Sequence, residues 1–155
     1  MAKIAVGKKV PEFSRPATGG SEWQLGAAAG KTLVLYFYPK DLTSGCTTQS
    51  QNFRDLYAKF KRAGVQIVGV SRDSLKSHDK FREKENLPFE LLSDEDESLC
   101  KLFDVIREKS LYGRKYMGVD RSTFLIDSQG VLRREWRKVK VPGHAEEVLE
   151  AAKAL

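Results

Sequence analysis

The chain has 155 residues, of which 41% are hydrophobic and 31% are charged, which suits one domain with a substantial core. Two cysteines without framework spacing argue against a disulfide-stabilised secreted domain, and the longest clean apolar run, residues 33–38, is far too short to cross a bilayer. The first residues resemble neither a signal peptide nor a transit peptide, so we expect a single domain over residues 1–155 in the cytoplasm, without membrane contact.

The first predicted strand leads directly to a cysteine. Residues 33–38 have the pattern of a buried strand, and Pro39 favours an exit from regular structure because proline cannot donate to a strand ladder. A helix is then predicted by apolar residues at three- and four-residue spacing, followed by a glycine that ends it: Phe53, Leu56, Tyr57, Phe60, Ala63 and Gly64. Thr43 or Ser44 is the expected N-cap, which places Cys46 at about the third helical position, facing inward.

This position suits a reactive thiol. Unpaired N–H groups at a helix N-terminus favour thiolate over thiol, and the thiolate is the nucleophile. A helix end alone rarely stabilises a thiolate enough, so we expect a cationic side chain from elsewhere in the chain beside Cys46. The alternative is a buried small hydrophobe, the commonest role of a lone cysteine.

The rest of the chain alternates strands and helices. Strands are predicted at residues 66–71, 89–92, 122–126 and 131–136, and a turn at 128–130 joins the last two as a hairpin. Parallel strands with crossover helices and a terminal hairpin make an α/β sandwich. A final helix after residue 143 should pack against the sheet through one apolar face, formed by Ala145, Val148, Leu149 and Ala152.

Two further segments lie between these strands. Cys100 falls in a short predicted helix that Ser93 or Asp94 caps, at the edge of an apolar face. Residues 107–117 show no clear periodicity, and we expect them to form a loop near the site.

The residues around Cys46 resemble a known family. Pro39, Thr43 and Cys46 reproduce the Pro-x-x-x-Thr-x-x-Cys pattern of the peroxiredoxins, and residues 38–41 and 45–48 are similar to its peroxiredoxin Q branch, also called bacterioferritin comigratory protein. The similarity extends over nearly the whole chain, through residues 11–13, 69–71, 92–94 and 121–127. It implies a thioredoxin-like fold, in which helices flank a central mixed β-sheet, with an N-terminal β-hairpin extension.

The resemblance also implies one site. Cys46 would be the peroxidatic nucleophile, which attacks a hydroperoxide oxygen and becomes a sulfenic acid. Arg121 would be the cation beside it, although from the sequence alone it looks like a solvated charge before a buried strand. Thr43, which could equally be only an N-cap, would offer its hydroxyl to the peroxide, and Pro39 would shield the sulfur from bulk water. Gln49 stands where relatives often have glutamate, and it can still accept a hydrogen bond from a guanidinium.

A resolving cysteine is missing from the places where similar proteins carry it. Position 51, five residues after the nucleophile, is Gln51, and residues 74–85, on the next helix, contain no cysteine. Only Cys100 remains, as a buried inert thiol, an intrachain resolving partner or an intermolecular one. We therefore expect a one-cysteine mechanism in which an external thiol reduces the sulfenic acid, with an atypical two-cysteine cycle through Cys100 as the alternative.

By the same resemblance the chain would be a monomeric thiol peroxidase. Its substrates would be hydrogen peroxide and alkyl hydroperoxides, its reductant thioredoxin or another thiol, and it would need no cofactor and no metal.

Other classes fit less well. The net charge of +6 and the five cations within residues 133–140 would suit a basic nucleic-acid-binding module, but we expect a solvated strand exit and loop there. Gln49 rules out a Cys-x-x-Cys reductase motif, and Asn52 a Cys-x5-Arg phosphatase motif. A cysteine hydrolase needs a histidine base, and we expect His78 and His144 to face solvent. The cysteines and histidines are too scattered for a zinc site.

Overall fold

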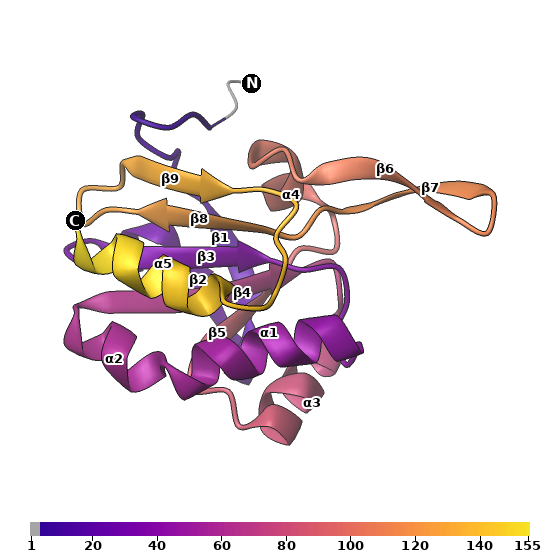
Figure 1. The fold of residues 1–155 in the computed structure, drawn as a ribbon, viewed down its shortest axis with the longest axis horizontal. Coiled ribbons are helices and arrows are strands. Elements are labelled where there is room, and N and C mark those ends of the chain that lie inside the picture. Colours follow the sequence, from indigo (N-terminus) through magenta and orange to yellow (C-terminus); the bar gives the residue numbers. More distant parts are fainter. Residues whose placement is uncertain (1–3) are drawn as a thin grey trace.

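A seven-stranded mixed sheet forms the centre of the molecule (Figure 1). The computed structural model describes residues 4–155. The strand order is β2-β1-β5-β4-β3-β8-β9, in which β3, β4 and β5 are parallel neighbours and the other pairs are antiparallel. The strands are β1 (Ser14–Ala17), β2 (Ser21–Gln24), β3 (Thr32–Phe37), β4 (Val65–Ser71), β5 (Glu90–Ser93), β8 (Ser122–Ile126) and β9 (Leu132–Trp136). This is the expected thioredoxin-like arrangement, and the β1–β2 pair is the predicted N-terminal hairpin.

Helices cover both faces of this sheet. They are α1 (Ser44–Asp55), α2 (Tyr57–Arg62), α3 (Leu75–Glu85), α4 (Ser98–Leu102) and α5 (His144–Lys153), with short 3-10 turns η1 (Thr18–Gly20) and η2 (Leu25–Ala28). The apolar residues of α1, α2, α3 and α5 pack in one core cluster, and those of α4 pack in another. Among the described residues no helix has both the length and the apolar character that a bilayer crossing requires.

Strand β3 divides the core into these two clusters. Because successive side chains of a strand point to opposite faces, Val34 and Tyr36 join the cluster of α1 and α5, whereas Leu35 and Phe37 join the cluster of α4. All four side chains are fully buried, since the strand is covered on both faces. The predicted apolar face of the last helix is likewise buried, in the same cluster as Tyr36.

The close packing of β4 predicts an effect on stability. A Cβ added at Gly69 would lie 2.8 Å from Leu91 and 2.9 Å from the Tyr36 ring, so Gly69→Ala should lower the free energy of unfolding by about 1–3 kcal/mol. Chemical denaturation measures this difference. The matched control is Gly26→Ala, whose added Cβ would meet Glu12 at an ordinary 3.6 Å. Equal stability of the two variants would contradict the prediction.

The helix predicted after Cys46 is interrupted. Leu56 lies between α1 and α2 with φ −97° and ψ 1°, so the chain bends there instead of forming one continuous helix. Phe53 and Phe60, on either side of the bend, are both fully buried, and the apolar spacing therefore persists across it. The predicted stop at Gly64 agrees with its φ of +76°, but Ala63 is exposed rather than part of the buried face.

The expectation of a loop at residues 107–117 was wrong. Strands β6 (Ile106–Leu111) and β7 (Arg114–Val119) form an antiparallel ribbon, which extends away from the sheet in Figure 1. Its two turn residues, Tyr112 and Gly113, both have positive φ, as two-residue hairpins require. Most of the ribbon is exposed on both faces, so its sequence lacks the alternation of buried and solvated residues that predicts a strand.

Candidate active site

Cys46 is the third residue of α1 and is only 1% exposed. The sheet determines this placement, since β3 ends at Phe37 and a short loop carries the chain into α1. Both predictions for Cys46, its helical position and its inward direction, are confirmed. A thiol here is close to the positive end of the helix and sheltered from water.

Thr43 is the N-cap residue of α1, but its side chain does not cap the helix. Its hydroxyl instead donates a hydrogen bond to the Lys40 carbonyl oxygen at 2.8 Å, and the side chain is exposed. Pro39 is half-buried in the loop between β3 and α1, consistent with its predicted role at the strand end. Two roles stay predictions: the binding of peroxide by Thr43, and the shielding of the Cys46 sulfur from bulk water by Pro39.

Arg121 supplies the cation that Cys46 was expected to need. Its Nη2 donates to Cys46 Sγ at 3.4 Å, and its Nη1 donates to Gln49 Oε1 at 2.6 Å. The sheet register explains the contact, because Ser122 pairs with Phe37 and the residue before β8 therefore lies where β3 leads toward α1. The guanidinium thus spans one turn of α1 and brings its positive charge to Cys46 Sγ.

Two neighbours of this guanidinium restrict its position. A Cβ added at Gly45 would lie 3.3 Å from Arg121 Nη2, closer than an ordinary contact. Gln49 is 1% exposed, and its Nε2 has no hydrogen-bond partner within residues 4–155. The predicted acceptor role of Gln49 toward a guanidinium is therefore observed, and the amide keeps an unused donor beside it.

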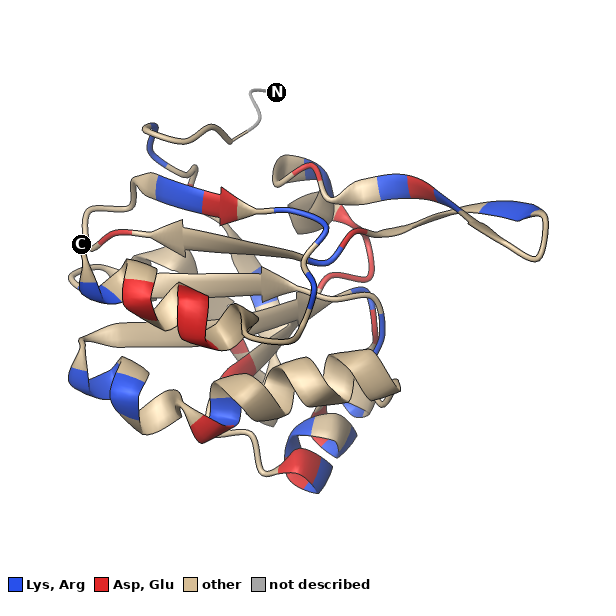
Figure 2. Cartoon of the chain, viewed as in Figure 1, with Lys and Arg blue, Asp and Glu red and all other residues tan. Residues whose placement is uncertain are grey.

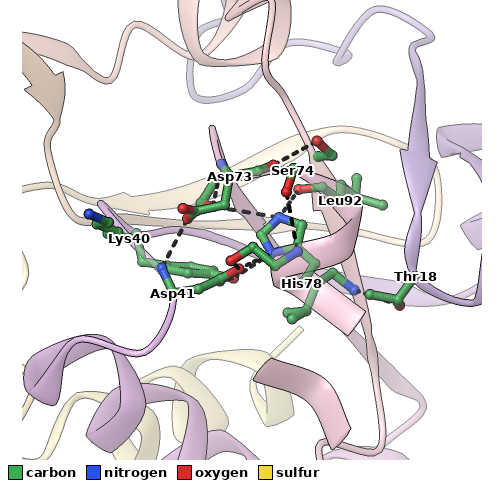
Figure 3. Close-up of polar contacts among 12 residues, drawn as sticks. Thr18, Lys40, Asp41, Asp73, Ser74, His78 and Leu92 are labelled. Carbon is green, nitrogen blue, oxygen red and sulfur yellow. Dashed lines mark hydrogen bonds and ion pairs between the residues drawn. The ribbon is translucent and has the colours of Figure 1, made fainter. Parts of the chain in front are cut away.

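His78 is fully buried, contrary to the expectation that it faces solvent. Figure 3 shows its ring between Asp41 and Leu92. Its Nδ1 lies 2.7 Å from Asp41 Oδ2, and its Nε2 lies 2.8 Å from the Leu92 carbonyl oxygen. Asp41, which sequence reasoning did not single out, comes from the loop before Cys46. The 74–85 helix is mostly polar, and this pattern predicted an exposed His78. Local spacing could not indicate the contact with Asp41, because Asp41 lies 37 residues earlier in the chain.

The expectation for His144 was also wrong, since this side chain is only 6% exposed. Its Nε2 lies 2.8 Å from Thr123 Oγ1, and its ring meets Trp136 edge-on at 5.7 Å between centroids. Burial lowers the pKa of His144 to about 4, so the ring is neutral at pH 7. Neither histidine hydrogen-bonds to Cys46 in the described part of the chain, as a histidine–cysteine hydrolase pair would.

Cys100 lies on the opposite face of the sheet from Cys46. It is fully buried in the core cluster of α4, whereas Cys46 belongs to the cluster of α1. The N–H groups of Leu99 and Cys100 donate to the Asp94 carboxylate at 3.0 Å and 2.7 Å, so Asp94 caps the helix start as predicted, although Glu97 is the formal N-cap residue. Burial, reinforced by the negative charge of Asp94, raises the pKa of Cys100 far above its ordinary value, and its thiol stays protonated.

The basic residues near the end of the chain make intramolecular contacts. Arg133 pairs with Asp127 at 3.3 Å, Arg134 stacks over the Trp136 ring at 4.5 Å from its centroid, and Arg137 donates to two backbone carbonyls at 2.8 Å and 3.0 Å. Figure 2 shows Lys and Arg spread over β9, the ribbon and the helices, with acidic residues among them. Over residues 4–155, the cations seen in this view are interspersed with acidic residues and do not form one stripe.

Comparisons with known proteins show which family the chain matches. The model of the AhpC/TSA family matches residues 6–135. The chain is 54% identical over 137 residues to peroxiredoxin Bcp of Xanthomonas campestris, covering 88% of this chain and 86% of that one. It is 48% identical over 150 residues to peroxiredoxin Bcp of Bacillus subtilis, covering 97% and 96%. Among solved structures, the chain superposes on the Xanthomonas campestris bacterioferritin comigratory protein with a TM-score of 0.87 and 51% sequence identity. The match covers 92% of this chain and 90% of that one, and that protein was studied for its alkyl peroxide reduction activity.

Proposed function

This chain belongs to the AhpC/TSA family and is a peroxiredoxin of the Bcp type, and from that premise we propose that Cys46 is its peroxidatic nucleophile. The observation that carries the proposal is the 3.4 Å contact between the Arg121 guanidinium and Cys46 Sγ at the third position of α1. The guanidinium supplies a positive charge and a hydrogen-bond donor at the sulfur, close to the positive end of the helix.

The reaction is a two-electron oxidation of sulfur. The Cys46 thiolate attacks one oxygen of a hydroperoxide, an S–O bond forms as the O–O bond breaks, and the leaving oxygen takes up a proton to depart as water or an alcohol. Negative charge moves from the sulfur onto the leaving oxygen during this step. Arg121 donates to the sulfur and is positioned to stabilise that charge. Thr43 and Pro39 complete the proposed site through peroxide binding and shielding.

The surface at the start of α1 supports alkyl hydroperoxides, in addition to hydrogen peroxide, as substrates. A shallow, mainly apolar groove runs past the start of α1, between Gly45 and Thr48 on one side and Val141 and Pro142 on the other. An alkyl chain loses contact with water in such a groove, whereas hydrogen peroxide needs only the polar centre. The related Xanthomonas campestris protein was studied for alkyl peroxide reduction.

Mass spectrometry of the reduced protein tests the proposal. After one equivalent of hydrogen peroxide or an alkyl hydroperoxide, Cys46 should gain one oxygen atom and react with a reagent specific for sulfenic acids, such as dimedone. Peroxide consumption should then continue in the presence of thioredoxin or dithiothreitol. An unmodified Cys46 after complete consumption of peroxide would overturn the assignment.

The position of Cys100 supports reduction of the sulfenic acid by an external thiol. A disulfide needs Cα atoms within about 7 Å, whereas packed layers are about 10 Å apart and a whole sheet separates the clusters of the two cysteines. The protonated Cys100 thiol would also be a poor nucleophile. A two-cysteine cycle through Cys100 would require large local unfolding.

We therefore expect Cys100→Ser to retain thiol-dependent peroxidase turnover near the wild-type rate. The measurements are the steady-state rate with dithiothreitol and non-reducing mass spectrometry of the wild type after one equivalent of peroxide. Cys100→Ala is the companion variant, because it avoids a buried hydroxyl next to Asp94. An intrachain Cys46–Cys100 crosslink would instead establish the two-cysteine cycle.

A further inference from the structure

A buried polar network lies under the loop that leads to Cys46 (Figure 3). Its centre is the pair Asp41 and His78, which are 4% and 0% exposed, with 2.7 Å between Asp41 Oδ2 and His78 Nδ1. Around this pair, Tyr38 donates its hydroxyl to Asp41 Oδ1 at 2.6 Å, and Ser77 donates to Asp41 Oδ2 at 2.8 Å. The pair thus connects the loop between β3 and α1 to the first turns of α3.

The partners of His78 determine where the protons lie. The Leu92 carbonyl oxygen, 2.8 Å from Nε2, can only accept, so Nε2 carries a hydrogen. Asp41 accepts from two hydroxyls, and burial raises the pKa of Tyr38 so that this phenol remains a donor. The same carboxylate lies 2.7 Å from His78 Nδ1, so Asp41 and His78 are joined by a buried hydrogen bond.

The same network holds the backbone of the loop. The Asp41 N–H donates to Asp73 Oδ2 at 2.9 Å, and Asp73 also accepts from Ser71 at the end of β4 at 2.6 Å. The next residue, Leu42, has φ +65°, a left-handed conformation that a leucine adopts only under constraint. Side-chain and backbone bonds of Asp41 thus fix the loop immediately before the strained residue, and α1 begins two residues later.

We propose that Asp41 and His78 are positioning residues for the nucleophile, and that their buried hydrogen-bonded pair holds the start of α1 so that Cys46 faces Arg121. This inference rests on the proposed role of Cys46. The sulfur and the guanidinium come from separate elements, so their contact depends on the position of the loop between β3 and α1. Small displacements of reacting groups have large effects on rate, and a released loop should therefore slow oxidation.

Two reactions of Cys46 distinguish positioning from general stability. In Asp41→Asn and His78→Asn the rate constant for oxidation by hydrogen peroxide should fall at least about fivefold, because that reaction needs an aligned thiolate and guanidinium. Alkylation by iodoacetamide also uses the Cys46 thiolate but needs no donor at a leaving peroxide oxygen, so it should fall by a smaller factor than peroxide oxidation does. The control is Val65→Ala, a buried truncation at the far end of β4, which should affect neither rate.

Nuclear magnetic resonance of the reduced wild-type protein tests the hydrogen-bonded pair without peroxide. With ¹⁵N-labelled histidine, the Nε2 hydrogen of His78, which the Leu92 carbonyl accepts, should exchange slowly with water, and Asp41→Asn should accelerate that exchange. Rapid exchange of this hydrogen in the wild type would overturn the proposal, as would unchanged peroxide oxidation in both folded variants. If the variants do not fold, the wild-type spectrum decides. Failure of Cys46 to form a sulfenic acid in the wild type would instead refute the proposed function. The two failures are distinguishable, because the spectrum of His78 does not depend on the reaction of Cys46 with peroxide.

Discussion

Replacement of Cys46 by serine should abolish peroxidase activity. A serine hydroxyl remains protonated at neutral pH and is a weak nucleophile toward a peroxide oxygen, so it would need a base. Neither histidine is placed to act as one. His78 is hydrogen-bonded to Asp41 and Leu92, and His144 is hydrogen-bonded to Thr123. Turnover with dithiothreitol should fall to the rate of the uncatalysed reaction. Oxidation by one equivalent of peroxide should leave no mass increase at position 46.

The control for this experiment is Cys100→Ser, which removes the other thiol and should remain active. Circular dichroism and thermal unfolding of Cys46→Ser should match the wild type closely, since serine is nearly the same size and the rest of the α1 core cluster is unchanged. Appreciable thiol-dependent peroxidase activity in a folded Cys46→Ser protein would contradict the assignment and direct attention to Cys100.

Removal of the guanidinium at Arg121 should slow oxidation of Cys46 at least about tenfold. In other enzymes, the loss of a single electrostatic donor lowers kcat by a factor of about 10²–10³. Two effects add in Arg121→Ala. The sulfur loses the guanidinium 3.4 Å away, and the leaving oxygen loses a donor in the transition state. Stopped-flow oxidation by hydrogen peroxide measures the rate constant.

Two variants separate charge from geometry at this position. Arg133→Ala removes the same charge from an exposed ion pair with Asp127 and should leave oxidation unchanged. Arg121→Lys keeps the charge but cannot reach both Cys46 and Gln49 with a planar fork, so its rate should lie between those of the wild type and Arg121→Ala. Oxidation of Arg121→Ala at the wild-type rate would remove Arg121 from the mechanism.

The relation of the two cysteines is the clearest example of information that local patterns lack. The helix around Cys100 and its cap by Asp94 were predictable from neighbouring residues. The face of the sheet on which that helix packs was not, because it depends on how the chain crosses between strands. The choice between a one-cysteine and a two-cysteine cycle depends on this face, so spacing alone left it open.

The sequence by itself determined the order of β3, β4, β5, β8 and β9 and of the helices among them, and the place of Cys46 at the start of α1. Through family resemblance it also determined the candidate role of Arg121. These features depend on near neighbours in the chain, or on a motif that similar proteins share. Only the tertiary structure decided that Arg121 meets both Cys46 and Gln49, that His78 is buried against Asp41, and that residues 107–117 form a ribbon. The physical reason is that buried polar groups are satisfied by partners distant in sequence, and an exposed ribbon has no buried face to impose a pattern.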